Sequence, residues 1–479
     1  MHRLKRLVVM GGLIALVAVA VIAVVNHLSR HSRDYLLTSG TEMIPAPWLI
    51  PVKPGEAVLH LTMVHDVIHE RFPRHGPAWF TARQVQTQAE LDRLSDQPTD
   101  DERRFALLDD LAVGYERLGQ PGLGILILRR KLERQLSSQP EAQRTHVIPA
   151  LYTTYANLGT LLIHASFAGA RSGKADDLAR LSEGGEFIRL AMQANPDAHF
   201  GRETWQAEAV EAMLANIANP KRLLIIDMMG LDMEDDRTVD ANRLRFGYAH
   251  MISMAGGFDS IQQRSASGDI SLTKQVREYI PLVRRKTASG VVEQRPFDEP
   301  TLGLVGMWTL GGGANPHSAL ALAHLMESVQ QRRIAWDAYE RAIELGSNFW
   351  PDPQISAQLL DHCRKRQRRI QEHLGVAAEV LRAQHQRELT KGLEYRAAYQ
   401  AYEAAQLTSG RSVRDPQLNA DFLASHPPIA SQPSDEDAIS APLPPRFVDT
   451  LPLWIAGLAG LVVVAMTLQA IDRRYFSPA

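Results

Sequence analysis

The sequence has almost no cysteine and almost no net charge. Among 479 residues there is one cysteine, Cys363, and the formal net charge is only −2. A single cysteine excludes an internal disulfide framework and a cysteine-rich zinc site. Near-neutral charge leaves no broad basic surface, so we expect no nucleic-acid partner. The lone thiol lies on a segment with helical periodicity, where a small buried hydrophobe is the simplest role and a reactive or cross-linking group is the alternative.

The rest of the composition is that of packed structure. Of all residues, 45% are hydrophobic and 22% are charged, which is an ordinary balance for folded domains. A chain of this length has room for two or three domains. We therefore expect most of it to fold.

A pattern of small and apolar residues in segment 108–136 gives the first structural prediction. Apolar residues spaced by three and four positions form one face of a first helix, Gly119 then breaks the chain, and Pro121 can begin a second helix. The positions expected to pack are Leu108, Leu111, Ala112, Tyr115, Gly124, Leu128, Lys131 and Leu132. Ala112 opposite Gly124 would let the two helix axes approach closely. The segment is therefore predicted to be a helix-turn-helix unit.

Two further units with this spacing are found, one near 155–196 and one within 302–406. In the first of these, we expect a loop over 168–179 to separate the two helices. All three units resemble the tetratricopeptide repeat, whose small and aromatic residues have these spacings, although Lys131 replaces a residue that is usually small. The resemblance implies stacked helix pairs with a concave surface that binds other proteins.

The unit within 302–406 has a clear beginning. Asn315 can cap a helix whose first position is Pro316. After this unit, residues 355–405 are predicted to form long helices, with Gly375 and Gly392 as candidate breaks.

Composition divides the chain further. Residues 26–54 hold closely spaced prolines and are predicted to be a tether. Residues 55–254 form the predicted helical-repeat region. In 255–301 the helical period fades, so we expect an irregular loop before the helices of 302–406 resume. Residues 407–450 are dense in Ser, Pro, Asp and Ala and are predicted to be a disordered linker.

The first apolar run covers residues 7–25, nineteen uncharged residues, and is long enough to span a bilayer. It follows a short basic segment, residues 1–6. A cleaved signal peptide is the alternative, with Ala18-Val19-Ala20 as its small-residue site. The apolar run continues without a polar break to Val25, which favours a membrane anchor.

A second apolar run covers residues 451–471, with Trp454 near one end and arginines in the tail 472–479 beyond the other. These flanks are typical of a spanning helix. Lys and Arg mark the cytoplasmic side, and both chain ends carry them, so both tails, 1–6 and 472–479, are predicted to be cytoplasmic. The protein is then a two-pass inner-membrane protein whose large central domain is periplasmic in a bacterium.

His65 and His69 are the sharpest candidates for a functional site. They are four positions apart, so on a helix both could bind one metal ion, and the acidic Asp66 follows the first. The pattern resembles the helix of zinc metalloproteases, with Asp in place of Glu, which shortens the reach of a catalytic base. No third ligand can be identified. Histidines packed in or beside the core are the alternative reading, and it is the one that we favour.

Three other patterns are weaker. Gly311-Gly312-Gly313 precedes a helix but lacks the Lys-Ser/Thr of a phosphate loop, so a flexible turn is expected. An acidic run suggests calcium but lacks the central glycine and terminal glutamate of a calcium loop. It consists of Asp232, Glu234, Asp235, Asp236 and Asp240. Ser271 and Lys274 have the spacing of a nucleophilic serine motif without its supporting motifs.

The sequence thus predicts an all-α protein, a tetratricopeptide-like solenoid between two terminal transmembrane helices. We expect a membrane-anchored extracytoplasmic scaffold whose partners are the membrane and other proteins. No enzymatic activity and no cofactor are expected. One alternative is a metal-dependent hydrolase centred on His65 and His69, and another is a structural subunit of a larger membrane complex.

Overall fold

The computed structural model describes residues 61–94, 100–137, 149–196, 202–234, 282–329, 331–347, 349–415 and 417–426. All of them lie within one compact unit, Leu36–Ser431. Among these residues no helix combines the length and the apolar character needed to cross a bilayer. Both predicted spans, 7–25 and 451–471, lie outside the described residues, as do the tether 26–54 and the two terminal tails.

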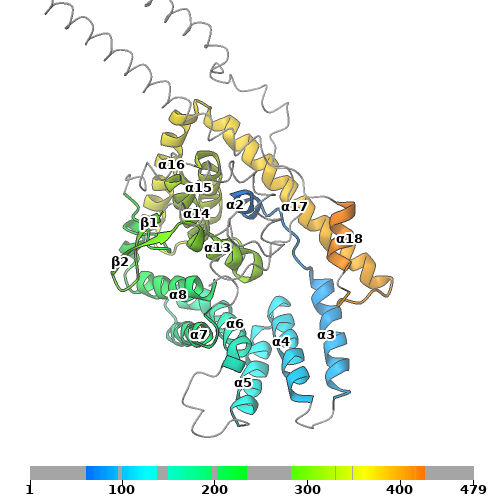
Figure 1. The fold of residues 1–479 in the computed structure, drawn as a ribbon. Helices are drawn as coiled ribbons and strands as arrows, with labels where there is room; N and C mark the ends of the chain where they lie inside the picture. The colour runs from blue at the N-terminus through cyan, green and yellow to red at the C-terminus, as the bar shows by residue number, and fades with distance from the viewer. Residues whose placement is uncertain are drawn as a thin grey trace, which may run out of the picture. The chain divides into compact units, whose positions relative to one another are not determined.

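Helices dominate the described residues, so the coarse prediction of an all-α fold is confirmed (Figure 1). The α-helices are α2 (Leu61–Ile68), α3 (Pro77–Leu91), α4 (Asp101–Arg117), α5 (Pro121–Ser137), α6 (Tyr152–Arg171), α7 (Ala175–Ala194), α8 (Arg202–Ala218), α13 (Asp298–Met307), α14 (Pro316–Ser328), α15 (Arg332–Gly346), α16 (Pro353–Leu374), α17 (Ala378–Thr408) and α18 (Gln417–Ser425). The short helical turns are η3 (Pro149–Leu151), η5 (Pro220–Leu224) and η6 (Trp308–Gly312), and the strands are β1 (Leu282–Lys286) and β2 (Val292–Pro296).

Helices α3 to α8 pack in the order of the sequence (Figure 1). Each helix contacts the next, and α6 also contacts α4 and α8, two helices away. Contact between neighbours and between alternate helices is the packing of stacked helix pairs. The predicted helix pairs 108–136 and 155–196 correspond to α4 with α5 and α6 with α7.

Small residues allow the closest approaches in this stack. A Cβ on Gly124 would lie 2.6 Å from the backbone oxygen of Ala112, so the predicted meeting of these two residues is confirmed. A Cβ on Gly159 would lie 2.8 Å from the backbone oxygen of Gly184. Real Cβ atoms do not come so close to backbone, so both glycines are required by packing density.

Lys131, which departs from the tetratricopeptide pattern, is explained by a buried ion pair. Its side chain is only 2% exposed and its ammonium group donates to the carboxylate of Asp109 on α4. Burial lowers the pKa of Lys131 and raises the pKa of Asp109, so the pair costs desolvation energy that the mutual attraction offsets. The long side chain of Lys131, in place of the usual small one, thus fills this position between α4 and α5.

The largest apolar core lies among α13, α14, α15, α16 and α2. Trp308, Trp336 and Tyr339 are its largest fully buried side chains. Cys363 is also buried there, and burial raises the pKa of its thiol to about 12, which confirms the simpler role predicted for it. The thiolate needed for reactivity is therefore suppressed.

Local signals at the ends of α14 and α16 are confirmed. The side chain of Asn315 accepts a hydrogen bond from the backbone N–H of Ser318, and Pro316 is the first residue of α14. Gly375 ends α16 in the left-handed conformation, with φ of +65°. Gly392, the other candidate break, lies inside an unbroken α17.

Three predictions about connecting segments are wrong. The loop expected over 168–179 is only a tight turn, because α6 continues to Arg171 and α7 begins at Ala175. The irregular segment 255–301 contains an antiparallel hairpin, in which Arg284 of β1 pairs with Gln294 of β2, and the start of α13. The predicted linker 407–450 includes helix α18, held by the buried Leu418 and Phe422. Residues 427–450 lie outside the described part of the chain.

Candidate functional site

His65 and His69 lie on α2 and on the turn that follows it. The backbone N–H of His69 donates to the carbonyl of His65 at 3.1 Å, so the helical spacing extends one residue beyond α2. Val64, Val67 and Ile68 are fully buried, which fixes α2 against α13 and α15. The ring of His69 is therefore fully buried, whereas the side chain of His65 remains 13% exposed.

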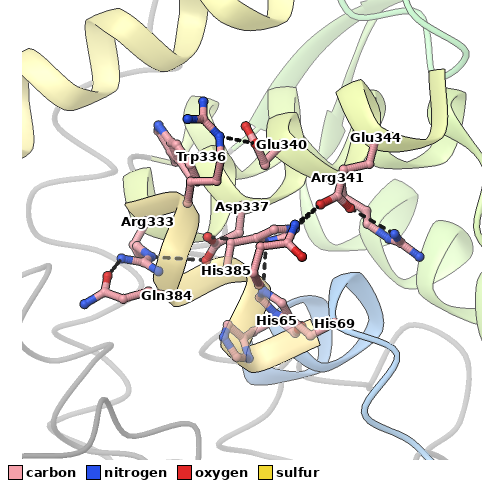
Figure 2. Close-up of polar contacts among 12 residues, drawn as sticks. His65, His69, Arg333, Trp336, Asp337, Glu340, Arg341, Glu344, Gln384 and His385 are labelled. Atoms are coloured by element: carbon pink, nitrogen blue, oxygen red, sulfur yellow. Dashed lines mark hydrogen bonds and ion pairs between the residues drawn. The ribbon is translucent and has the colours of Figure 1, made fainter. Parts of the chain in front are cut away.

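Two residues distant in the sequence join these histidines. Asp337 comes from α15 and His385 from α17 (Figure 2). One ligand atom from each of His65, His69 and Asp337 lies within 4.8 Å of the other two. Nε2 of His69 lies 3.1 Å from Nδ1 of His385. The structure thus supplies the further candidate ligands that the sequence did not identify.

Neighbours hold the outer polar atoms of His69 and Asp337, and an acidic residue lies behind His385. Nδ1 of His69 lies 2.8 Å from the backbone oxygen of His65, and since a carbonyl can only accept, this nitrogen carries the proton. Nε2 of His385 faces Oε1 of Glu344 at 3.4 Å. Nε of Arg333 donates to Oδ2 of Asp337 at 3.2 Å. His69 and Asp337 are therefore fixed on the side away from the cluster, whereas Nε2 of His385 makes no hydrogen bond within the described residues.

One buried carboxylate oxygen of the cluster has no hydrogen-bond donor among the described residues. Oδ1 of Asp337 makes no hydrogen bond with any residue that the structure describes, although Asp337 is 1% exposed. Nδ1 of His385 lies 3.7 Å from it. A buried carboxylate oxygen without a donor costs free energy, so this atom needs a cation or a proton close by.

Ionisation in the cluster follows from burial and from the adjacent charges. Burial, strengthened by the neighbouring His65, lowers the pKa of His69 well below its usual value. Burial alone would raise the pKa of Asp337, but the charge of Arg333 and the contact with His385 hold it well below the usual range. For His385, burial acts downward, yet the contacts with Asp337 and Glu344 raise its pKa to about 9. The cluster therefore combines a neutral histidine, a carboxylate and a cationic histidine.

The segment after His69 runs along α17. Nη1 of Arg71 donates to Glu388 at 3.2 Å, and the backbone N–H of Gly76 donates to Glu403 at 3.1 Å. Gly392 lies between these two contacts. A Cβ on Gly392 would overlap the carbonyl oxygen of His69 and would lie 2.9 Å from its carbonyl carbon. Gly392 is thus required for the backbone after α2 to approach α17.

Glu70 lies where the segment after α2 contacts α17. Its backbone φ of +57° is in the left-handed region, and its side chain is buried. It accepts a hydrogen bond from Nε1 of Trp308 at 3.0 Å and one from Arg396 at 2.7 Å, while Arg341 lies 3.7 Å away. One carboxylate therefore connects α15, α17 and η6.

Asp66, which occupies the position of the metalloprotease base, is engaged elsewhere. Nε of Arg71 donates to Oδ1 of Asp66 at 2.7 Å, and Nη2 of the same arginine donates to it at 2.5 Å. Arg71 also lies 3.2 Å from Nδ1 of His65. The carboxylate of Asp66 is thus held by an arginine, which does not favour the hydrolase interpretation.

The remaining sequence candidates are not brought to this cluster. Arg74 donates to the carbonyl of Trp308 at 2.7 Å, and Arg117 donates to the carbonyls of Leu310 and Gly311. The backbone leading into the glycine run therefore presents carbonyl oxygens to arginines, which is the reverse of an anion cradle. Asp232 and Glu234 belong to an exposed turn, and the remaining acidic residues, with Ser271 and Lys274, lie outside the described residues.

A second histidine pair lies apart from the first. Nδ1 of His324 lies 2.8 Å from Oδ2 of the buried Asp227, and its Nε2 lies 3.0 Å from Nε2 of His362. Burial and the neighbouring His324 lower the pKa of His362 to about 3. This pair is a second place where histidine nitrogens and a buried carboxylate lie together, so it can serve as a comparison when metal binding to the first cluster is measured.

Sequence reasoning missed Asp337, His385 and Glu344. Asp337 lies among buried apolar positions of α15, and a charged residue there is the signal that could have been noticed. His385 stands in a polar helical stretch where a histidine has no special meaning. It is separated from His69 by 316 positions, so no local spacing connects the two.

Comparison with protein-family models, with the curated proteins and with the solved structures finds no match to the chain.

Proposed function

We propose that the chain is a membrane-anchored scaffold whose helical-repeat region binds other proteins outside the cytoplasm. The observation that carries this proposal is the unbroken packing of α3 to α8, in which each helix contacts the next and α6 also contacts α4 and α8. Stacks of this kind have an extended surface and no need for a catalytic centre. The tetratricopeptide resemblance of the helix pairs supports the same function.

Exposed apolar side chains indicate where a partner would bind. Leu123 and Leu126 on α5 are 47% and 45% exposed, and Val85 on α3 is 66% exposed. Large exposed apolar groups are a common feature of protein-binding surfaces. The exposed Arg129 and Arg130, which follow Leu126 on α5, supply a polar border there.

The double variant Leu123→Glu with Leu126→Glu tests this surface. Because both side chains are exposed, the fold should persist, whereas two charges in an apolar interface should lower the recovery of bound proteins at least about tenfold. The measurement is quantitative mass spectrometry of proteins cross-linked to the full-length chain in its own cells. Leu393→Glu, at a leucine on α17 that is 40% exposed, is the matched control. Equal recovery of the same proteins with both variants would contradict the proposed surface.

The location of the scaffold is a separate part of the proposal, supported by the apolar runs 7–25 and 451–471 and their basic flanks. A reporter enzyme active only outside the cytoplasm should be active when fused at about residue 300. A reporter active only inside should work at either terminus. Cytoplasmic activity of the internal fusion would show that the central region is not exported.

A further inference from the structure

We propose that His69, His385 and Asp337 bind one zinc ion, and that His65 completes its coordination shell. The site does not depend on the scaffold function proposed above. It joins α2, α15 and α17, which are far apart in the sequence and meet at this point (Figure 2).

Distances between the ligand atoms fit tetrahedral zinc. With zinc bound at about 2.0–2.1 Å, the ligand atoms of a tetrahedron lie about 3.3 Å from one another. Nε2 of His69 and Nδ1 of His385 are 3.1 Å apart, and Nδ1 of His385 and Oδ1 of Asp337 are 3.7 Å apart. His65 offers an atom within 4.8 Å of both His69 and Asp337. Two of the separations are thus near the tetrahedral value, and His65 must move closer to complete the shell.

The atoms behind the ligands have the arrangement typical of zinc sites. A zinc-binding histidine usually donates its other N–H to a carbonyl or a carboxylate. His69 does so to the backbone oxygen of His65, and Nε2 of His385 faces Glu344. Asp337 is held through Oδ2 by Arg333, which leaves Oδ1 directed at the cluster. Two ligands are thus oriented by hydrogen bonds to their outer atoms, and Glu344 lies 3.4 Å behind the third.

The buried oxygen of Asp337 supplies a second reason to expect a metal ion, because the neighbouring cationic group, His385, lies 3.7 Å away and donates no hydrogen bond to it. Oδ1 makes no hydrogen bond within the described part of the protein, and the side chain is almost fully buried. A metal ion would satisfy this oxygen and the unprotonated nitrogen of His69 together. His385 would then bind as neutral imidazole, with the proton on Nε2 donated to Glu344.

His65 must change its own hydrogen bond to take part. If its Nε2 binds zinc, its Nδ1 carries a proton, which Arg71 cannot accept. Oδ1 of Asp66, 3.7 Å from that Nδ1, is the available acceptor. His65 is also the most exposed of the four ligands, so it is the one that closes the site after the ion has entered.

Burial makes the role of this ion structural. His69 and His385 are fully buried and Asp337 is 1% exposed, so the shell has no open position for substrate. Closed four-ligand sites stabilise folds, whereas catalytic zinc keeps a free position. The ion would fasten the segment that includes α2 to the helices α15 and α17.

Zinc analysis of the full-length chain without a histidine tag is the first test. We expect one zinc per chain after dialysis against metal-free buffer. We also expect that Co²⁺, added to chelator-treated protein, produces the visible absorption of a tetrahedral nitrogen and oxygen site. If the unmodified protein binds neither ion at micromolar concentration, the cluster is only a hydrogen-bonded network and the proposal is wrong.

Variants then locate the ion. Asp337→Asn and His385→Gln should each lower zinc affinity at least about 100-fold, more than loss of an orienting partner. Glu344→Gln removes only such a partner and should lower affinity about 10-fold to 100-fold. Zinc retained by Asp337→Asn but lost by His362→Gln would assign the ion to the second histidine pair and overturn the proposal.

Two further variants complete the comparison. The exposed His373→Gln should leave zinc binding unchanged. If a variant of a buried ligand fails to fold, His65→Gln at the exposed edge keeps the test decisive, because it should weaken zinc binding and alter the Co²⁺ spectrum. Full retention of both the zinc affinity and the spectrum by this variant would exclude His65 from the shell.

Discussion

Replacing Gly392 with alanine should destabilise the protein by about 3 kcal/mol, the upper end of the usual overpacking cost. Helix propensity acts in the opposite direction, since alanine is favoured over glycine within a helix by about 1 kcal/mol. The new Cβ would overlap the carbonyl oxygen of His69 and would lie 3.0 Å from the backbone nitrogen of Arg71. Because these atoms are backbone, neither can rotate away. The measurement is the urea midpoint, with an unchanged slope of the transition.

Gly122→Ala is the matched control for this prediction. Gly122 also lies in a helix, α5, but among the described residues no atom comes within 4 Å of the position of its Cβ. This variant should be unchanged or more stable by up to about 1 kcal/mol. If Gly392→Ala were as stable as Gly122→Ala, the segment after α2 would not lie against α17 as described.

The second large effect is expected for Glu70→Ala, at about 3–5 kcal/mol. The change leaves Arg396 and Arg341 without their shared carboxylate and removes the acceptor of the Trp308 N–H. Glutamate and alanine both occupy the left-handed backbone of this position at similar cost, so the comparison isolates the side-chain contacts. Thermal and urea unfolding should both report the loss.

Two variants define what Glu70 contributes. Glu70→Gln keeps an acceptor for Trp308 but removes the charge, so its stability should fall between that of the alanine variant and that of the unmodified protein. Glu394→Ala, at an exposed glutamate of α17, should change stability by less than about 0.5 kcal/mol. Equal stability of Glu70→Ala and Glu394→Ala would mean that the buried carboxylate does not hold these elements together.

Helix pairs could be predicted where local patterns agree with packing. The contact of Ala112 with Gly124 and the cap formed by Asn315 depend on residues a few positions apart, and both are present in the structure. The hairpin was missed because its inward positions do not look apolar. Besides Val283, the other buried residue of β1 is Arg285, whose guanidinium lies 4.8 Å from the ring of Trp205. A buried arginine hides the alternation that marks a strand.

The candidate site could also be predicted only in part, because local patterns identify only residues that are close together in the sequence. Helical spacing identified His65 and His69, but Asp337 and His385 reach them only through the packing of α15 and α17. Gly392 was predicted as a break because glycine weakens helices, yet here it serves a close approach to the backbone of His69. Helix α18 was missed because only Leu418 and Phe422 hold it within a polar stretch.

The placement of α17 also sets the order in which the protein can be completed during synthesis. His69 and His385 are separated by 316 positions, so at about 5–20 residues per second roughly 15–60 s pass between their appearances on the ribosome. During that interval the segment from His69 to Gly76 lacks the surface that later covers it, and Glu70 lacks Arg396. The helix pairs α4 to α7 need only neighbours and can form as they emerge. The last step is therefore the packing of α17 onto the segment that was made earlier. A nascent chain stopped before α17 would leave helix α2 within reach of chaperones and proteases.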